Sequence, residues 1–516
     1  MSYSPALGST ISNTKVRTPE NVSPFSGMCS VCTAACTGPC EIGLSAVRGS
    51  EATFPYRRDI NQFASEKDYP LDFSHLSING RVFGTVGCDE DADEATYPKV
   101  KTETEFGKKN KVKMKMPIIL PAIAKLNWRD YYIGAALAGV SVVIGEDAIP
   151  NDKNLVLENG KVAASPLVEE MVNDFRKYSK GYGEIIMQAS YDDENSGVLD
   201  YVVPKLGVKS VELKFGQAAK GIQGMGRINN LEEALKLQGK GYLVYPDPSD
   251  QKVAENFKNG KGPVFEKIGK LPIWNEEILK NRIAHLRELG AERICLKTGP
   301  FDPKDLIRIL KIASENEVDL VTFDGAGGGT GNSPVKMMNE WGMPTVNLES
   351  MLYNILKRMD EKGYFLPQVA ITGGFALEDQ IFKGLALGAP YIQFVAVGRA
   401  AMAAAMVGKQ VGELIEKGNT PKEYQAFGNT KEEIFACIRE LKLDYDNAQD
   451  LPAGAVGVYS YINRIAAGTK QLLALNRKFD IKYIDRSDIF PLTGLAAHVT
   501  GLDTYEDVYI RELEKI

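Results

Sequence analysis

The sequence predicts an α/β protein built on a (β/α)8 TIM barrel, preceded by a cysteine-rich segment and followed by a helical extension. Three observations lead to this prediction. A short β-branched run followed by an amphipathic helical pattern recurs about eight times between residues 116 and 407. Four cysteines lie close together ahead of this region, and helical patterns dominate residues 408–516. We therefore expect three parts: residues 1–115, 116–407 and 408–516.

The composition is that of an ordinary globular enzyme, with 44% hydrophobic and 25% charged residues. The net charge is −6 and the basic residues are spread among acidic ones, which argues against a nucleic-acid partner. No run of eighteen apolar residues occurs, which argues against a membrane span. The first 28 residues lack an apolar leader, and the chain has only seven cysteines. We therefore expect a cytoplasmic protein with reduced thiols.

The first element is the cysteine run, in which two, three and three residues separate successive cysteines. The run is one residue longer than the bacterial ferredoxin motif and has Glu41 where that motif has proline. Small residues between the cysteines allow the thiolates to converge on one iron–sulfur cluster, and we expect a 4Fe–4S rather than a 3Fe–4S cluster. The proposed ligands are Cys29, Cys32, Cys36 and Cys40.

Two other interpretations of this run remain open. Four cysteines also bind structural zinc, although usually as two separated pairs, and a disulfide framework is the third interpretation. Cys88, in the sequence Val-Gly-Cys-Asp, either replaces one ligand or is an ordinary loop thiol.

The next elements are the eight barrel strands, each a short apolar run, and all but the first end in glycine or serine. A helical pattern follows each run, as expected for parallel βα units. In a TIM barrel the active site lies at the carboxyl ends of the strands. The expected strands are residues 117–123, 141–145, 183–190, 210–216, 293–299, 318–325, 367–374 and 391–398.

The loops after the seventh and eighth strands predict a phosphate site. They contain Gly373 and Gly374 in one loop, and Gly398 and Arg399 in the other. Glycine lets backbone amides approach phosphate oxygens closely, and a helix start adds the positive end of its dipole. Loops at these two positions commonly hold phosphate in TIM barrels. The alternative is that the glycines only form tight βα corners.

Polar residues at the ends of apolar strands indicate a functional mouth. Glu212 and Lys214 share one face of the fourth strand, and Cys295 and Lys297 share one face of the fifth. Gln188 ends the third strand. Structural explanations exist for each residue, because the lysines could reach solvent and Glu212 could form an ion pair with either.

The loop at residues 324–334, after the sixth strand, begins with Asp324 and Gly325 and is unusually rich in glycine. Such a loop suits close approach to a flat ligand. No G-x-G-x-x-G pattern occurs in the chain, so a dinucleotide-binding Rossmann unit is not expected.

Together these segments resemble the FMN-binding synthase domain of glutamate synthase, in a small form without the glutaminase domain. The resemblance spans about residues 117–407. It implies that FMN lies across the barrel mouth and that 2-oxoglutarate binds over its ring. Ammonia would add to give 2-iminoglutarate, which reduced FMN would convert to L-glutamate, with electrons arriving through an iron–sulfur cluster. The segments that carry the resemblance are Gln188-Ala189-Ser190, residues 212–221, Leu296-Lys297, residues 324–334 and Thr372-Gly373-Gly374.

The resemblance also implies roles for individual residues. Gln188 and Lys214 would contact the flavin, whereas Gln217, Lys220 and Lys297 would line the flavin and oxo-acid site. A cation near the flavin N1 stabilises the anionic reduced ring, and another can neutralise a substrate carboxylate. We expect Lys297 in the first role and Lys220 in the second. The residues expected at the glycine loop and the phosphate are Asp324, Gly325, Gly373, Gly374, Gly398 and Arg399.

The sequence departs from the family in three respects. It begins Met1-Ser2 and has no room for the glutaminase, so ammonia should be free or supplied by an amidotransferase partner. Residues 398–406, directly after the eighth strand, contain no cysteine, although the family has its cluster ligands there, so the N-terminal cysteines would take electrons from ferredoxin or a reductase subunit. Residues 182–195 and 242–270 differ on the substrate side, which leaves the identity of the oxo acid open.

Two other functions are considered. One is an FMN and iron–sulfur oxidoreductase that acts on another small substrate, and the other is an electron-transfer subunit. An α-hydroxyacid oxidase would need a histidine base near a strand end. The three histidines, His75, His285 and His498, do not follow any predicted strand. In the C-terminal extension, residues 459–475 have the apolar spacing of a helix that packs against neighbouring helices.

Overall fold

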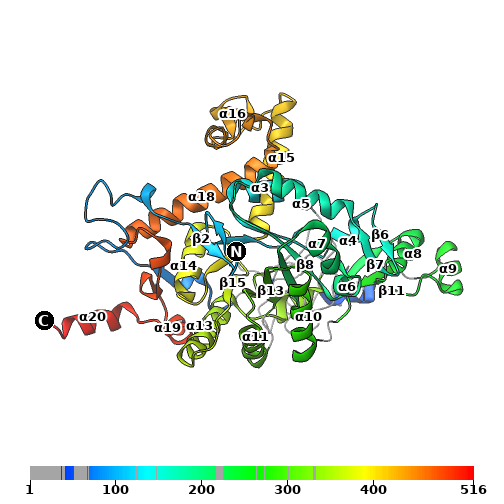
Figure 1. Cartoon of the computed structure of the whole chain (residues 1–516), viewed down its shortest axis with the longest axis horizontal. Helices are drawn as coiled ribbons and strands as arrows, with labels where there is room; N and C mark the ends of the chain where they lie inside the picture. The colour runs from blue at the N-terminus through cyan, green and yellow to red at the C-terminus, as the bar shows by residue number, and fades with distance from the viewer. Residues whose placement is uncertain are drawn as a thin grey trace.

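The computed structural model describes residues 37, 41–50, 65, 67, 69–123, 126–146, 148–216, 225–262, 264–271, 274–299, 302–328 and 333–516. Within these residues eight parallel strands form a closed barrel, in which β16 pairs with β4 and β9 pairs with β13 (Figure 1). Each observed strand lies inside the corresponding predicted range, so the predicted TIM barrel is confirmed. The strands are β4 (Ile118–Leu120), β5 (Ser141–Ile144), β8 (Ile185–Ala189), β9 (Ser210–Lys214), β13 (Arg293–Thr298), β14 (Leu320–Asp324), β15 (Gln368–Thr372) and β16 (Phe394–Ala396).

A helix follows each barrel strand and covers the outside of the barrel. In α11, for example, Asp302 caps the first turn, and Leu306, Leu310 and Ala313 repeat at helical spacing on the buried face. This spacing explains why the segment is a helix and which side faces the strands. The covering helices are α3 (Trp128–Ala138), α5 (Pro166–Tyr178), α7 (Val198–Leu206), α10 (Glu276–Glu288), α11 (Pro303–Glu315), α13 (Thr345–Glu361), α14 (Glu378–Gly388) and α15 (Arg399–Glu416).

Four βα loops contain additional elements, and in three of them these elements are small. After β5 come α4 (Ala148–Asn151) and the hairpin of β6 (Val156–Glu158) and β7 (Lys161–Ala164), and α6 (Tyr191–Asn195) follows β8. α12 (Val335–Glu340) follows β14. These loops leave the carboxyl ends of the strands, so their insertions lie on the side of the barrel where TIM-barrel active sites are found.

The largest insertion follows β9 and has a small core of its own, formed by Ile228, Ala234, Val244 and Phe265. Its three strands form an antiparallel sheet in the order β10, β12, β11. Its elements are β10 (Met225–Ile228), α8 (Leu231–Gly239), β11 (Leu243–Tyr245), α9 (Gln251–Lys258) and β12 (Phe265–Ile268), which lie together at one end of the molecule in Figure 1.

A short hairpin closes the other end of the barrel. It consists of β2 (Thr104–Phe106) and β3 (Val112–Met114), and the Phe106 ring packs edge-on against Phe394 of β16. Gly107 and Lys108 donate backbone hydrogen bonds to the side chains of Gln368 and Asp319, which lie at the amino ends of β15 and β14. The opposite end, at the carboxyl ends of the strands, is therefore the mouth.

The predicted helical extension is present, and its main element is α18 (Ala453–Leu475), which packs against α3 and α15. Glycines make this close contact possible: a Cβ at Gly134 would lie 2.5 Å from Cβ of Val458, and one at Gly412 would lie 2.3 Å from Cβ of Ala453. α15 itself continues through residue 407 to Glu416. None of the helices in the described part has both the length and the apolar character needed to cross a membrane.

A two-stranded sheet joins two segments that lie far apart in the sequence. β1 (Leu76–Ile78) pairs antiparallel with β17 (Ile489–Pro491). The short helices outside the barrel are α2 (Glu41–Arg48), α16 (Lys431–Ile434), α17 (Ile438–Leu441), α19 (Gly494–Thr500) and α20 (Tyr505–Leu513).

Candidate active site

A buried polar cluster connects four neighbouring strands near the mouth. Gln188 lies opposite Glu212, and Lys214 lies opposite Lys297, which in turn lies opposite Thr322. All five side chains are buried. Nε2 of Gln188 donates a 2.5 Å hydrogen bond to Oε1 of Glu212. The polar residues that the period-two pattern places on common strand faces thus meet in one cluster.

Glu212 is the centre of this cluster. Burial raises the pKa of its carboxyl group, while the charge of Lys297 opposes this increase most strongly. The hydrogen bond from Gln188, the charge of Lys214 and a hydrogen bond with Thr322 act in the same direction as Lys297. Removing a carboxylate from water is costly unless it gains such partners. Glu212 therefore ties together polar groups from three other strands, of which Lys297 carries a charge.

Glu146 is a site residue that the sequence interpretation missed. It follows β5 by two positions, and its Oε1 lies 2.9 Å from Nζ of Lys214. Lys214 is thus flanked by the carboxylates of Glu146 and Glu212. The signal in the sequence is the same as for the other residues, a polar side chain directly after an apolar strand.

A second buried carboxyl group, Asp193, lies beside this part of the site. It caps α6, where its Oδ2 accepts hydrogen bonds from the backbone and hydroxyl of Ser190, at 2.9 and 2.8 Å. Burial raises the pKa of Asp193 to about 7, the Ser190 hydrogen bonds oppose the increase, and the charge of Glu146 adds to it. Asp193 therefore titrates near neutral pH.

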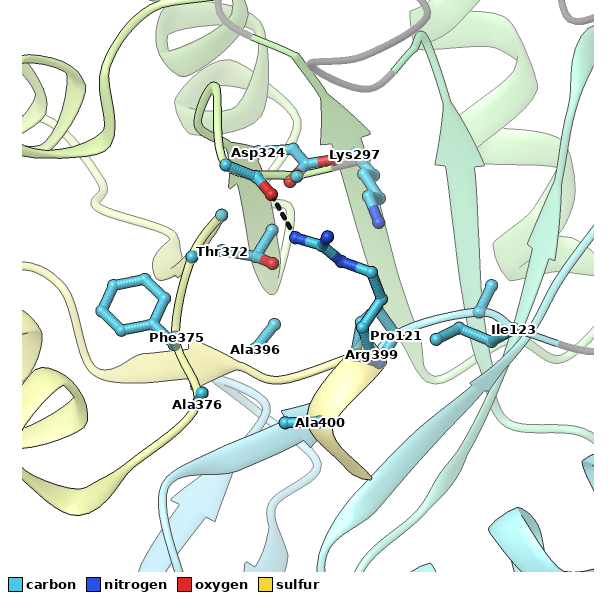
Figure 2. A pocket seen from close by; sticks show the side chains of 16 residues that line it. Pro121, Ile123, Lys297, Asp324, Thr372, Phe375, Ala376, Ala396, Arg399 and Ala400 are labelled. Atoms are coloured by element: carbon cyan, nitrogen blue, oxygen red, sulfur yellow. Dashed lines mark hydrogen bonds between the residues drawn. The ribbon is translucent and has the colours of Figure 1, made fainter. Parts of the chain in front are cut away.

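A cavity of about 230 Å³ opens at the carboxyl ends of β4, β13, β14, β15 and β16 (Figure 2). Gly373 and Gly374 form one wall with φ angles of +117° and +96°, a conformation that L side chains rarely adopt. A Cβ at Gly373 would lie 2.6 Å from the carbonyl oxygen of Gly325, whereas one at Gly374 would meet nothing within 4 Å. The first glycine is thus required for packing, and the second leaves open space beside the cavity.

Arg399 supplies a positive charge to this cavity. It is the first residue of α15, and no side chain caps the start of that helix. Its Nη2 donates a 2.6 Å hydrogen bond to the carbonyl oxygen of Gly327. Burial lowers the pKa of Arg399, and the charge of Asp324 opposes this shift. Figure 2 shows Arg399 reaching from α15 toward Asp324 and Lys297. A guanidinium, glycine-rich backbone and a helix start together are suited to an anion.

Most of the predicted site residues fall in these two adjoining regions. Gln188 and Lys214 belong to the polar cluster, and Lys297 belongs to both the cluster and the cavity. Gly325 has a structural position instead, because a Cβ there would lie 2.2 Å from Oγ1 of Thr345. The predicted residues that line the cavity are Lys297, Asp324, Gly373, Gly374, Gly398 and Arg399. The wall also includes Thr372 and Phe375, which were not predicted.

Several predicted residues lie outside the described residues, namely Gln217, Lys220, Cys29, Cys32, Cys36 and Cys40. Their roles therefore stay predictions. Within the described ranges, no group of three or more His, Cys, Asp or Glu side chains could hold a metal ion. Cys88 is a half-buried free thiol.

Comparison with known proteins gives one family match. Residues 270–410 match the family described as "Conserved region in glutamate synthase". This stretch contains β13 to β16, and with them Lys297, Asp324 and the two glycine loops. The predicted resemblance is confirmed for this half of the barrel. No curated protein sequence matches the chain.

Solved structures resemble the chain only distantly. A double mutant of flavocytochrome b2 with pyruvate bound is 14% identical, with 85% of this chain and 81% of that chain covered and a TM-score of 0.47. A soluble mutant of the membrane-associated (S)-mandelate dehydrogenase from Pseudomonas putida is 15% identical, with 81% and 88% covered and a TM-score of 0.43.

Proposed function

We propose that this protein is an FMN-dependent oxidoreductase of the glutamate synthase type, which reductively aminates 2-oxoglutarate with ammonia to give L-glutamate. The observation that carries the proposal is that Lys297 lines the same cavity as Gly374 and Arg399. Lys297, the cation that would stabilise a reduced flavin ring, and the residues that would bind the flavin phosphate thus line one cavity. The match of residues 270–410 to the conserved region of glutamate synthase supports this assignment.

The residues present fit FMN. Gly373, Gly374, Gly398 and Arg399 would hold the phosphate through backbone amides, the start of α15 and the guanidinium charge. At about 230 Å³ the cavity is smaller than the ~300–1,000 Å³ typical of pockets for whole ligands, so it suits the phosphate end rather than all of FMN. Gln188, Lys214 and Lys297 would hold the ring.

FMN, when bound, supplies the hydride that reduces the imine formed from the oxo acid and ammonia. Lys297 places positive charge where the reduced ring needs it, and Glu212 keeps that lysine and Gln188 in position. Lys220 and Gln217 would hold the substrate carboxylates and keep the reacting carbon in place. The cluster residues Cys29, Cys32, Cys36 and Cys40 would pass electrons from ferredoxin or a reductase subunit, and ammonia would be free or come from an amidotransferase partner.

The positions of the histidines support amination over hydroxyacid oxidation. His285 lies in α10, and its Nε2 is 3.0 Å from a carboxylate oxygen of Asp200, outside the barrel. His498 lies in α19, and His75 precedes β1. The chain thus has no histidine at a barrel strand end to act as the base that removes a proton from a hydroxyacid.

A second candidate, an FMN and iron–sulfur oxidoreductase acting on another small substrate, is favoured by one observation. The loop that leaves β9 after Lys214 carries the insertion from β10 to β12, which has its own core. Insertions in βα loops are the usual means by which TIM barrels change substrate. The test must therefore decide whether the substrate is 2-oxoglutarate or another small molecule.

The test uses the purified holoenzyme under anaerobic conditions. Its flavin spectrum is bleached with dithionite, and 2-oxoglutarate and ammonium are added together. Recovery of the oxidised spectrum, with one glutamate formed per reduced flavin, supports the proposal. Recovery with another small oxidant but not with this pair supports the second candidate. Iron and acid-labile sulfide are counted in the wild type and in Cys36→Ala, and an unchanged count in the variant would remove the cluster assignment.

A further inference from the structure

The glycine loop after β15 borders two cavities. One is the cavity of about 230 Å³ at the barrel mouth, and the other, which we call the rear cavity, has a volume of about 290 Å³. Gly327, Gly373 and Gly374 line both cavities, so at these residues the wall between them is formed by backbone alone. A Cβ at Gly327 would lie 2.8 Å from backbone atoms of Gly373 and Gly374, so the two glycine loops are in direct contact. A group that fixes the rear side of this wall therefore also fixes its mouth side.

A segment that precedes the barrel also lines the rear cavity, with Ser65, Lys67, Tyr69 and residues 71–74. Within it Asp72 caps the short 3-10 helix η3 (Phe73–His75) and accepts a 2.8 Å hydrogen bond from the amide of Ser74. Nζ of Lys383 in α14 donates a 3.0 Å hydrogen bond to the carbonyl oxygen of Phe73. β1 follows η3 directly and pairs with β17. The segment around Phe73 is thus attached to the barrel helices and to the C-terminal extension.

Phe73 brings this segment into contact with the loop after β15. Its ring centroid lies 5.1 Å from that of Phe375, and both side chains are buried. Phe375 directly follows Gly374 and lines the mouth cavity, but Figure 2 shows its ring turned away from Arg399. A Cβ at Gly384 of α14 would lie 2.7 Å from Cε1 of Phe375, so the ring also packs closely on that helix. The Phe375 ring therefore attaches the loop to Phe73 and to α14.

The loop needs such attachments because its glycines have no side chains that could hold it. One attachment is the hydrogen bond of 2.7 Å that Oγ1 of Thr345 donates to the carbonyl oxygen of Gly373. The packing of the Phe375 ring is the second. Flexible glycine backbone loses conformational freedom when its amides bind an anion, whereas amides that are already oriented bind the anion more tightly. A contact that orients this loop in advance thus increases its affinity for phosphate.

We propose that Phe73 is a positioning residue for the flavin phosphate, because by packing on Phe375 it holds the loop amides in the orientation that binds phosphate. Phe73 lines the rear cavity and not the mouth cavity, so it acts through Phe375 and does not touch the flavin. This inference rests on the proposed FMN site. Coupling between two sites is reciprocal, so bound FMN also stabilises the segment around Phe73.

The experiment titrates the full-length apoprotein with FMN and with riboflavin, which lacks the phosphate. Phe73→Ala should bind FMN about tenfold more weakly, roughly the contribution of one aromatic pair, with its affinity for riboflavin unchanged. Phe73→Tyr retains the ring and should bind FMN as the wild type does. Phe257→Ala is the matched control, because Phe257 makes a similar tilted contact with Phe265 in the insertion, with ring centroids 4.9 Å apart. This control should leave both affinities unchanged.

A second measurement, hydrogen exchange of the wild type, needs no substitution. FMN, but not riboflavin, should slow exchange at the amides of Ser74 and His75, which donate hydrogen bonds to Asp72. Exchange that FMN leaves unchanged would overturn the inference. So would a Phe73→Ala variant that keeps the FMN affinity of the wild type, or one that loses affinity for both flavins equally. A wild type that binds neither flavin would instead contradict the proposed function, and this inference with it.

Discussion

Gln188 and Glu212 face each other across the third and fourth barrel strands and are joined by a 2.5 Å hydrogen bond. An ionised carboxylate only accepts hydrogen bonds, so this contact fixes the amide of Gln188 with its Nε2 toward Glu212. The charge of Lys297 in turn helps to keep Glu212 ionised despite its burial. The orientation of the Gln188 amide and the surroundings of the Lys297 ammonium therefore depend on the same carboxylate.

Replacing Lys297 by Met should keep the fold but weaken the binding of reduced flavin. The variant removes the cation that lines the cavity, so the flavin midpoint potential should fall, and turnover should decrease by roughly 100-fold, as for loss of one charge-stabilising group. Spectroelectrochemical titration measures the potential. An unchanged flavin midpoint potential would show that Lys297 does not stabilise the reduced flavin.

Replacing Glu212 by Gln should destabilise the protein by about 3 kcal/mol, because Lys297 loses the buried charge that compensates it. Urea denaturation of the two proteins measures the difference. The matched control is Glu317→Gln, which breaks an exposed ion pair with Lys109 and should cost much less than the Glu212 substitution, because solvent screens exposed pairs. Equal costs for the two variants would show that the cluster does not depend on Glu212.

Replacing Gly374 by Ala should lower the affinity for FMN at least tenfold with little loss of folded protein. The new methyl group meets no protein atom within 4 Å but lies beside the cavity, where the phosphate is proposed. Gly363→Ala is a control for a methyl group on a glycine of positive φ away from the cavity, because Gly363 has a φ of +72° with nothing within 4 Å of its Cβ. Fluorescence titration of the apoprotein compares the two. If both variants bind FMN alike, Gly374 does not border the phosphate.

Replacing Asp193 by Asn should stabilise the protein at high pH only. The pKa of Asp193 is about 7 in the folded state against an ordinary value of 3.8, so the fold favours the protonated form. Its contribution is fully present below pH 3.8 and is lost as the pH rises to about 7, where the carboxyl group must ionise in a buried place. Melting temperatures at pH 4.5 and 8 should therefore show a gain for Asp193→Asn only at pH 8.

Glu433 provides a control of opposite sign for this pH dependence. Hydrogen bonds from the backbone of Asn429 and Thr430 lower its pKa, so its contribution is present above pH 4.5 and is lost in acid. Glu433→Gln should show no gain at pH 8. A gain for Asp193→Asn that is equal at both pH values would contradict the assigned titration.

The barrel could be predicted from the sequence because buried parallel strands are continuous apolar runs, and each here ends near a glycine or a polar residue. That Gly373, Gly374, Gly398 and Arg399 lie at the mouth could be predicted because they directly follow the last two strands. Glu146 was missed because a single carboxylate after an apolar run looks like any surface charge, and only the 2.9 Å contact with Lys214 distinguishes it.

Other features depend on contacts that no local pattern contains. β1 and β17 have three residues each and lie more than 400 positions apart, so neither strand indicates its partner. The insertion after β9 has strands of three or four residues whose alternation is too short to identify. The raised pKa of Asp193 arises from burial by the surrounding fold and from the charge of Glu146, which is far from it in the sequence.

The central claim is that the barrel mouth binds FMN with its phosphate between Gly374 and Arg399. It is tested most directly by the affinities of the apoprotein for FMN and for riboflavin, which lacks the phosphate, in the wild type and in Arg399→Gln. The wild type should bind FMN at least about 100-fold more tightly, roughly the strength of two charge-assisted hydrogen bonds, and the variant should lose most of that preference. Equal binding of the two flavins by the wild type, or a preference that Arg399→Gln leaves unchanged, would contradict the account.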